Sequence, residues 1–257
     1  MLPTIFISHG SPMIALEDSP AAEFLSQLGK LLPRPKMILS ISAHWATLRP
    51  SVSLAAQPEI IYDFGGFPQA LYEMKYPAPG APELSLRVRE LLANSFIECD
   101  AVENRGFDHG TWIPLRLMYP EADIPVAQLS VQPNNDGKLH YKIGQALQVL
   151  REENVLILAS GTAVHNLNTI RPASETPAWA AKFEQWLTAE VMSGEAANLL
   201  DYAQLPEAKM AHPTPEHFLP FFVAMGAAAN ASGEFRGETL HRSWELGSLS
   251  MAAYSFA

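Results

Sequence analysis

Short, nearly continuous apolar runs alternate along this chain with longer helical patterns, and this alternation constrains the fold more than any other feature. The runs that favour strands occur at Thr4 to Ser8, Met37 to Ser42, Val52 to Ala55, Pro125 to Val131 and Val155 to Ala159, with a final strand expected in "GSLSMAAYSF". Continuous apolar runs of this length are typical of strands that are buried on both faces.

Helical periodicity fills the stretches between these runs. Helices are predicted at Ala21 to Leu32, Pro82 to Ala93, Lys138 to Glu153 and Ala178 to Met192, with a last helix opening at Thr214, where Thr214 can cap the helix and Pro215 suits its first position. We therefore expect an α/β fold with a central, mostly parallel or mixed sheet and helices on both of its faces.

Composition and charge limit the expected number of domains and the possible binding partners. The 257 residues are 48% hydrophobic, enough for one full core, so a single domain over residues 1–257 is expected. No apolar run approaches the roughly 20 residues that span a bilayer, so we expect no membrane association. A formal charge of −10 with only 17 Lys and Arg argues against a nucleic-acid partner. The lone Cys99 suits a reducing, cytoplasmic location and leaves histidines and carboxylates as metal ligands.

Several histidines follow the predicted strands. In open α/β sheets, ligands bind beyond the carboxyl ends of the strands, so polar residues at those positions are the candidates for function. The candidates are His9 after "TIFIS", His44 after "MILSISA", His165 after "VLILASG", His217 in the first turn of the last predicted helix, and His109 in a turn ahead of a helix near Trp112.

One such histidine alone is a weak signal, because most histidines at strand ends are structural or face solvent. Five that one sheet edge could gather are a stronger signal, and they predict a mononuclear metal site, since neutral imidazole is the commonest metal ligand. Of the remaining three, His140 and His241 are interpreted as surface residues and His212 as a loop residue. Neither "ASG" at 159–161 nor "DFGGFP" at 63–68 has the spacing of a nucleophile elbow or a phosphate loop.

Seven ordered motifs carry a specific resemblance: "SHGSPM", "SAHW", "DFGGFP", "YPAPG", "GFDHGTW", "ASGTAVHNL" and "HPTPEHFLP". In this order they resemble the 4,5-DOPA extradiol dioxygenase family, which belongs to the class III extradiol ring-cleaving dioxygenases. The resemblance extends from Thr4 to the "GSLSM" near the end of the chain, so it covers nearly the whole sequence.

The resemblance implies a role for each of the five histidines. His9, His44 and His217 match the ligands of a non-haem metal. His165 matches an acid/base residue that lies close enough to approach the metal when no substrate intervenes. His109 matches a histidine that contacts substrate or oxygen.

The ligand set departs from the wider class III pattern, which has two histidines and a glutamate. Glu216 precedes His217, and adjacent residues on a helix point about 100° apart, so only one of the two is expected to bind the ion; we predict His217. The resemblance implies Fe(II) for activity, whereas an all-histidine site also suits Zn(II), which lacks a redox step. A zinc-filled site would therefore not exclude an iron enzyme.

The implied reaction uses a catechol such as DOPA and O2 and yields a semialdehyde acid by cleavage beside the diol. His165 would take a proton from a catechol hydroxyl and later return one, and His109 could stabilise developing charge. Trp45, Phe64 and Trp112 lie beside the motif residues, where they could wall an aromatic ring or simply pack in the core.

Two alternatives from other classes stay open at this point. The same imidazoles could activate water in a zinc hydrolase, or they could bind metal or phenols on a scaffold without catalysis. The physiological catechol, the native metal, self-association and coordination by His165 at rest are not decided by the sequence.

Overall fold

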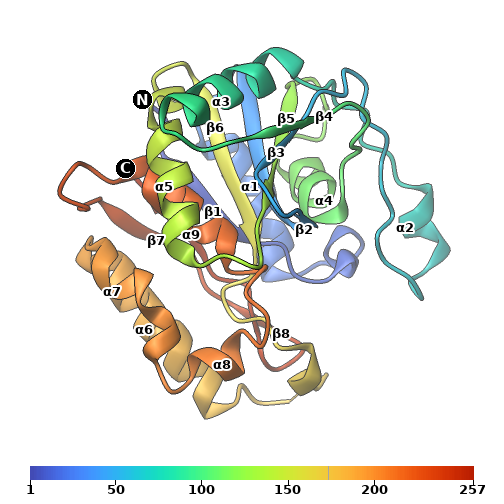
Figure 1. Cartoon of the computed structure of the whole chain (residues 1–257). Coiled ribbons are helices and arrows are strands. Elements are labelled where there is room, and N and C mark those ends of the chain that lie inside the picture. Colours follow the sequence, from blue (N-terminus) through green and yellow to red (C-terminus); the bar gives the residue numbers. More distant parts are fainter. Residues whose placement is uncertain (173) are drawn as a thin grey trace.

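The computed structural model describes residues 1–172 and 174–257, and an eight-stranded mixed sheet forms its centre (Figure 1). The strand order is β4-β3-β5-β2-β6-β1-β10-β7. The four inner strands run parallel to one another and are β1 (Thr4–Ser8), β2 (Met37–Ala46), β5 (Val126–Val131) and β6 (Val155–Gly161). Their apolar side chains are almost all buried, as the continuous hydrophobic runs predict.

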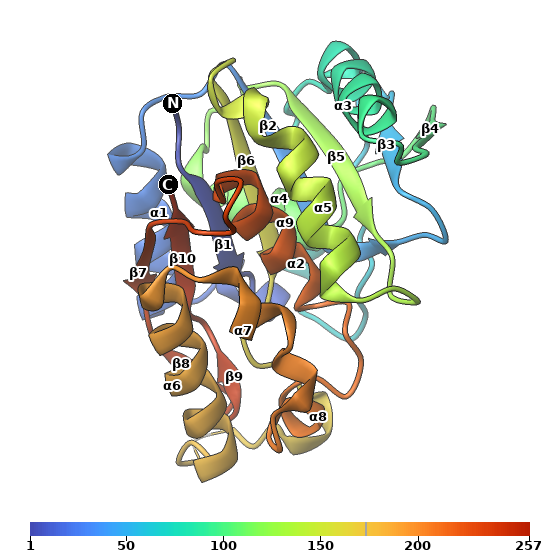
Figure 2. The same ribbon diagram turned by 60° about the vertical axis from the view of Figure 1, so that its left-hand side comes forward.

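Antiparallel pairing appears only toward the two sides of the sheet. On one side β3 runs antiparallel to β5 and parallel to β4, and on the other β10 runs antiparallel to both β1 and β7. The bounds of these strands are β3 (Ser51–Ser53), β4 (Asp100–Val102), β7 (Gly237–His241) and β10 (Ala253–Phe256), with β8 (Trp244–Glu245) and β9 (Leu249–Ser250) forming a separate pair. Thr4 lies opposite Phe256, so the two termini meet at one side of the sheet (Figure 2).

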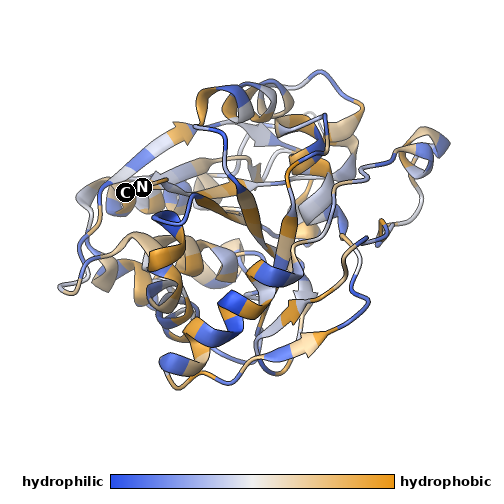
Figure 3. Cartoon of the chain, turned by 90° about the horizontal axis from the view of Figure 1, so that it is seen from above, coloured by the Kyte–Doolittle hydropathy of each residue, from blue (hydrophilic) through white to orange (hydrophobic). Residues whose placement is uncertain are grey.

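Helices cover both faces of the sheet, as predicted. One face carries α3 (Pro82–Asn94), α5 (Gly137–Leu147) and α9 (Leu219–Ala228), and the other carries α1 (Pro20–Leu31) and α4 (His109–Met118) (Figure 2). Viewed from above, the central strands are mainly apolar, while hydrophilic residues gather on outer helices and loops (Figure 3). The apolar side chains of these two helix layers pack on opposite faces of the sheet. This packing holds the strands, and therefore their ends, in fixed positions.

Shorter elements build the periphery. Helices α6 (Ala178–Ser193), α7 (Ala196–Leu200) and α8 (Ala208–Ala211) lie together beyond one end of the sheet, and α2 (Gln69–Glu73) lies on a loop that projects to the opposite side (Figure 1). The 3-10 helices are η1 (Pro12–Ala15), η2 (Gln148–Arg151), η3 (Leu167–Thr169) and η4 (Tyr202–Gln204).

The predicted elements are found with shifted ends. Strand β2 continues past Ser42 to Ala46, and its pairing with β5 shifts register after Ile41, so His44 belongs to the strand. The helix predicted to Glu153 ends at Leu147 and is followed by η2.

The expected opening of the last helix at Thr214 is wrong, because α9 begins at Leu219. The Thr214 hydroxyl donates to the Glu216 carboxylate instead of capping a helix, and the His217 carbonyl accepts the Thr162 N–H at 2.9 Å instead of a helical partner. His217 therefore lies in a turn before the helix, tied to the end of β6.

Candidate metal centre

The five predicted histidines lie together at the carboxyl ends of the parallel strands. His9 follows β1 directly, and its N–H donates to the Gly161 carbonyl at the end of β6 at 2.9 Å. His44 lies near the end of β2, and His165 follows β6 in a loop. His109 is the first residue of α4, which corrects the prediction of a turn ahead of a helix at Trp112.

Three of these rings converge on one point through the same type of atom. The Nε2 atom of His44 lies 3.0 Å from Nε2 of His9 and 3.3 Å from Nε2 of His217. The centroids of the His9 and His217 rings are 5.4 Å apart, so the three rings surround a small common volume. Residues from three separate parts of the chain are thus gathered at one position.

The tautomer of His9 follows from its neighbour Ser160. Nδ1 of His9 lies 2.9 Å from the Ser160 hydroxyl oxygen. That hydroxyl donates its own proton to the carbonyl of Gly110, so it can only accept a proton from the imidazole. A neutral His9 therefore carries its proton on Nδ1 and presents an unprotonated Nε2 to the other rings.

Carboxylates select the same tautomer for the other two rings. Nδ1 of His217 lies 3.1 Å from a carboxylate oxygen of Glu216, and Nδ1 of His44 lies 3.5 Å from Asp63. An ionised carboxylate accepts protons but donates none, so each Nδ1 is favoured as the protonated nitrogen. The Nε2 lone pair of His44 then faces those of both His9 and His217.

This arrangement fits a divalent metal ion. Three converging lone pairs repel one another unless a cation lies between them. A tetrahedral site with metal–nitrogen distances of about 2.0 to 2.1 Å holds its ligand nitrogens roughly 3.3 Å apart, close to the separations found here. The outer nitrogen of each ring contacts an oxygen, which is the usual support for metal-binding histidines.

Burial keeps these imidazoles neutral near pH 7. Burial, followed by repulsion from neighbouring imidazoles, lowers the pKa of His9 and His217 well below the ordinary value of 6.5. Burial also lowers the pKa of His44 to about 3 and that of His165 to about 4. Neutral imidazole is the form that binds a metal or accepts a proton.

Asp63 joins His109 to the triad. One oxygen of Asp63 accepts the backbone N–H of His109 at 2.9 Å and lies 3.0 Å from its Nδ1, where the ring N–H is misaligned for a full hydrogen bond. Burial alone would raise the pKa of Asp63, but its contacts with His109 outweigh this effect and lower the pKa to about 2. The rings of His44 and His109 have centroids 3.9 Å apart, so His109 borders the ring of His44 in the candidate site.

The start of α4 is fixed beneath the site by the buried Asp108. Its carboxylate caps the helix by accepting the Thr111 N–H at 3.2 Å and the Ser42 hydroxyl proton at 2.6 Å, and it pairs with Arg105 at 2.9 Å. Burial raises the pKa of Asp108, and the contacts with Ser42 and Arg105 oppose that effect. The backbone of His109 is thereby held against β2.

Gly110 allows α4 to approach the histidines closely. A Cβ atom at this position would lie 2.5 Å from Ser42 Oγ, 3.1 Å from His44 Cδ2 and 3.3 Å from His9 Cε1. The first of these separations is shorter than any ordinary contact. A glycine is therefore required for the helix to wall the site.

The other three histidines lie outside this group. The interpretation of His140 as a surface residue is wrong, because its side chain is completely buried. Its Nδ1 lies 2.9 Å from the Asp136 carbonyl and its Nε2 accepts the Gln132 N–H at 3.0 Å, so both ring nitrogens have partners inside the protein. His241 is only partly exposed and stacks on Phe24.

His212 is buried, and its Nε2 lies 3.0 Å from the Ala163 carbonyl. It anchors the loop after α8 to the segment after β6, which agrees with its interpretation as a loop residue. Among the aromatic candidates, Trp112 and Trp45 are buried, whereas Phe64 is half-buried and meets His109 edge-on at 5.7 Å between centroids.

Asp63 and Ser160 are the contacts that our sequence analysis missed. Both lie in quoted motifs, "DFGGFP" and "ASG", whose glycines and possible nucleophile drew attention away from these two side chains. A carboxylate two residues before a pair of glycines in a loop was the available signal. The partners of each could not be read from spacing along the chain.

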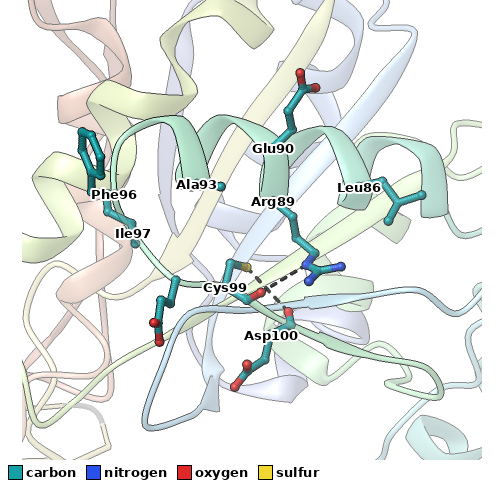
Figure 4. A pocket seen from close by; sticks show the side chains of 9 residues that line it. Leu86, Arg89, Glu90, Ala93, Phe96, Ile97, Cys99 and Asp100 are labelled. Carbon is teal, nitrogen blue, oxygen red and sulfur yellow. Dashed lines mark hydrogen bonds between the residues drawn. The ribbon is translucent and has the colours of Figure 1, made fainter.

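A cleft of about 740 Å³ beside α3 is separate from the histidines (Figure 4). Its lining includes Arg89, whose Nε donates to the Cys99 carbonyl at 3.1 Å, and the exposed Phe96. Burial raises the pKa of the Cys99 thiol to about 11, so this thiol is a poor nucleophile near pH 7. The histidine group therefore remains the candidate site for chemistry.

Fold and site together define an α/β protein with an imidazole-lined metal-type site at the carboxyl edge of its sheet. The family model for the catalytic LigB subunit of aromatic ring-opening dioxygenases matches residues 3–256. The chain therefore belongs to the LigB family, whose members are ring-cleaving dioxygenases that use a metal, and this confirms the family predicted from the seven motifs. It is accordingly an oxidoreductase of that class.

Relatives named 4,5-DOPA dioxygenase extradiol are similar over nearly their whole length. The protein of Beta vulgaris is 49% identical, with 98% of this chain and 96% of the relative covered. That of Escherichia coli K12 is 42% identical, with 88% and 85% covered. The crystal structure of an uncharacterized Escherichia coli K12 protein matches with a TM-score of 0.85 at 35% identity and covers both chains fully, which confirms the predicted fold class.

Among the residues that the structure describes, none of the helices combines the length and the apolar character needed to cross a bilayer.

Proposed function

We propose that this protein is an extradiol dioxygenase that opens the ring of a catechol such as DOPA with O2. The convergence of three unprotonated Nε2 atoms, from His9, His44 and His217, carries the proposal, because it provides a neutral donor set for one divalent ion. The names of the most similar relatives and the family membership support the substrate class.

The metal would be Fe(II) in the active enzyme. Held by these residues, a redox-active metal would acidify the catechol hydroxyls and connect the ring electronically to oxygen. Zn(II) fits the same donor set and would bind there without supporting turnover. His9, His44 and His217 would therefore hold either ion, while only one of the two gives activity.

His165 is the proposed acid/base residue. Its ring lies against His217, and its pKa of about 4 leaves it unprotonated near neutral pH. A base placed beside the ligands can take the proton of a catechol hydroxyl and return a proton at a later step of the reaction.

His109 is the proposed group that stabilises charge on substrate or oxygen. Its Nδ1 faces Asp63, which leaves Nε2 as the nitrogen available to another partner. Phe64, edge-on to His109, is the aromatic side chain best placed to wall a substrate ring.

The decisive experiment is anaerobic reconstitution with Fe(II), followed by catechol and then oxygen. Oxygen uptake should match substrate loss one for one, and labelled O2 should place both of its atoms in the product. Product that contains only solvent oxygen, or turnover that continues without oxygen, would support the hydrolase alternative and overturn the proposal. Binding of a catechol without any turnover would support the non-catalytic alternative.

A further inference from the structure

Asp63 touches two histidines for which the proposed function gives different roles. It lies on the loop that leads into α2, at the right of Figure 1, and is 46 residues from His109 in the chain. We propose that Asp63 is a positioning residue. Its carboxylate favours the tautomer of both His44 and His109 in which Nδ1 carries the proton, so that each Nε2 is free for metal or substrate. This inference rests on the proposed function.

The geometry gives each carboxylate oxygen a separate partner. Oδ1 accepts the backbone N–H of His109 at 2.9 Å and lies 3.0 Å from that ring's Nδ1, while Oδ2 lies 3.5 Å from Nδ1 of His44. Both ring contacts are electrostatic, and a negative carboxylate favours the tautomer that has its proton on the near nitrogen. One side chain thus selects the tautomer of two imidazoles whose ring centroids are only 3.9 Å apart.

The loop that carries Asp63 is itself fixed to the segment before α4. The Ile61 N–H donates to the Phe107 carbonyl at 2.8 Å, and the Phe107 N–H donates to the Glu59 carbonyl at 2.8 Å. Asp63 is therefore held in one place, and its carboxylate contacts the two rings from a fixed position. Phe64, the next residue, meets His109 edge-on, so the same anchoring sets the aromatic side chain beside the site.

A purely structural role is the competing explanation, because a carboxylate that accepts the N–H of the first α4 residue also supports a helix start. Asn supports a helix start about as well as Asp, so Asp63→Asn should be nearly neutral if this is the whole role. An Asn side chain, however, brings an NH2 donor toward an imidazole nitrogen. That donor favours the wrong tautomer, in which the proton moves to Nε2 and blocks metal binding.

The test compares Asp63→Asn with the wild type and with Asp136→Asn. Asp136 caps α5 by accepting the Lys138 and Leu139 N–H groups at 3.0 and 3.2 Å, and it supplies a matched Asp-to-Asn change at another helix start. Zinc affinity is measured by competition with a chelating indicator, the ligand field by the visible absorption of the Co(II)-loaded protein, and kcat and KM with Fe(II) and a catechol.

We expect Asp63→Asn to keep its thermal midpoint but to bind zinc on the order of 10- to 100-fold more weakly, with an altered Co(II) spectrum and a lower kcat. Asp136→Asn should match the wild type in all three. Wild-type zinc affinity and kcat in Asp63→Asn would overturn the inference. If Asp63→Asn does not fold, Asp63→Ala removes the carboxylate without adding a donor, and its zinc affinity and Co(II) spectrum are judged by the same criteria.

The zinc and cobalt measurements need no turnover, so the two proposals can fail separately. A wild-type protein that binds zinc but never consumes oxygen removes the proposed function, while weaker zinc binding by Asp63→Asn still supports the positioning role. A wild-type protein that consumes oxygen, with an Asp63→Asn variant equal to it, removes only the inference. A wild-type protein that binds no metal at all removes both.

Discussion

The imidazole rings of His165 and His217 stack face to face, with centroids 3.5 Å apart and planes only 8° from parallel. Their backbones are tied to different partners, since the His165 N–H donates to the Ala211 carbonyl and the His217 carbonyl accepts from Thr162, both at 2.9 Å. His217 turns its Nε2 toward His44, whereas His165 lies alongside it. In the proposed function, this stack would let one ring bind metal while the other takes and returns a proton at nearly the same place.

Replacing His44 by Ala should remove most of the bound metal. His44 contributes the central of the three Nε2 atoms, so the remaining two rings cannot enclose an ion on that side. Because His44 lies near the end of β2, the fold should persist, and the far-ultraviolet circular dichroism should match the wild type. Metal content after dialysis against a weak chelator is the measurement, and full occupancy would contradict the ligand assignment.

Replacing His165 by Ala should have the opposite pattern, with metal retained and turnover lost. General acid–base groups contribute on the order of 10²- to 10⁴-fold, so the single-turnover rate should fall within that range. Iron content assayed in the same samples separates this effect from loss of a ligand. A variant that loses its iron, or that reacts at the wild-type rate, would remove His165 from the acid/base role.

Glu216 and His217 can be separated by comparing Glu216→Gln with His217→Ala. Glu216 contacts the outer nitrogen of His217, so the amide should weaken metal binding moderately, whereas loss of the imidazole removes a ligand. We expect Glu216→Gln to retain more zinc at equal chelator concentration. The reverse order would show that the carboxylate binds the ion, as in the wider class III pattern.

The sequence predicts the central strands well because their signal is local. A buried parallel strand is a continuous apolar run, and β1 begins and ends where the pattern places it, at Thr4 and Ser8. The same reasoning places histidines at the strand ends, because the topology of such sheets determines where ligands bind. The direct contacts among these histidines arise from the tertiary structure. The family resemblance predicts them, whereas the spacing of the histidines along the chain does not.

Features decided by distant contacts were not predicted. The opening of α9 depends on a hydrogen bond between His217 and Thr162, which lie 55 residues apart in the sequence and cannot be paired by local capping rules. The burial of His140 depends on the Gln132 backbone folding back over the start of α5. Asp63 reaches its histidines only because the loop before α2 closes against the segment before α4.

Gly110→Ala should damage the site while leaving most of the fold intact. The new methyl would lie 2.5 Å from Ser42 Oγ and within 3.3 Å of the rings of His44 and His9, so these side chains would have to shift. We expect clearly weaker metal binding and a matching loss of activity. Gly65→Ala is the control, since a Cβ atom there meets nothing within 4 Å and Gly65 lies on the loop before α2. Equal metal affinity in the two variants would contradict the close approach as the reason for glycine.

His140 should make the metal-free protein less stable in acid, in a defined pH range. Its Nε2 accepts the Gln132 N–H and its Nδ1 lies against the Asp136 carbonyl, so a second proton would break the first bond inside the core. Burial lowers the pKa of His140 from 6.5 to about 4. Above pH 6.5 neither the folded nor the unfolded state binds this proton, so the group has no effect there.

As the pH falls from 6.5 to 4, the unfolded chain binds the proton and the folded chain does not, so the free energy of unfolding decreases. One group shifted over this range accounts for roughly 3 kcal/mol, and the loss levels off below the folded-state pKa. Urea unfolding at several pH values, with chelator present, should show a shallower acid slope in His140→Gln than in the wild type, whatever stability the substitution itself costs. The other histidines are the same in both proteins, so the difference between the slopes isolates this residue, and identical slopes would mean that His140 binds its proton over the same pH range in the folded and unfolded chains.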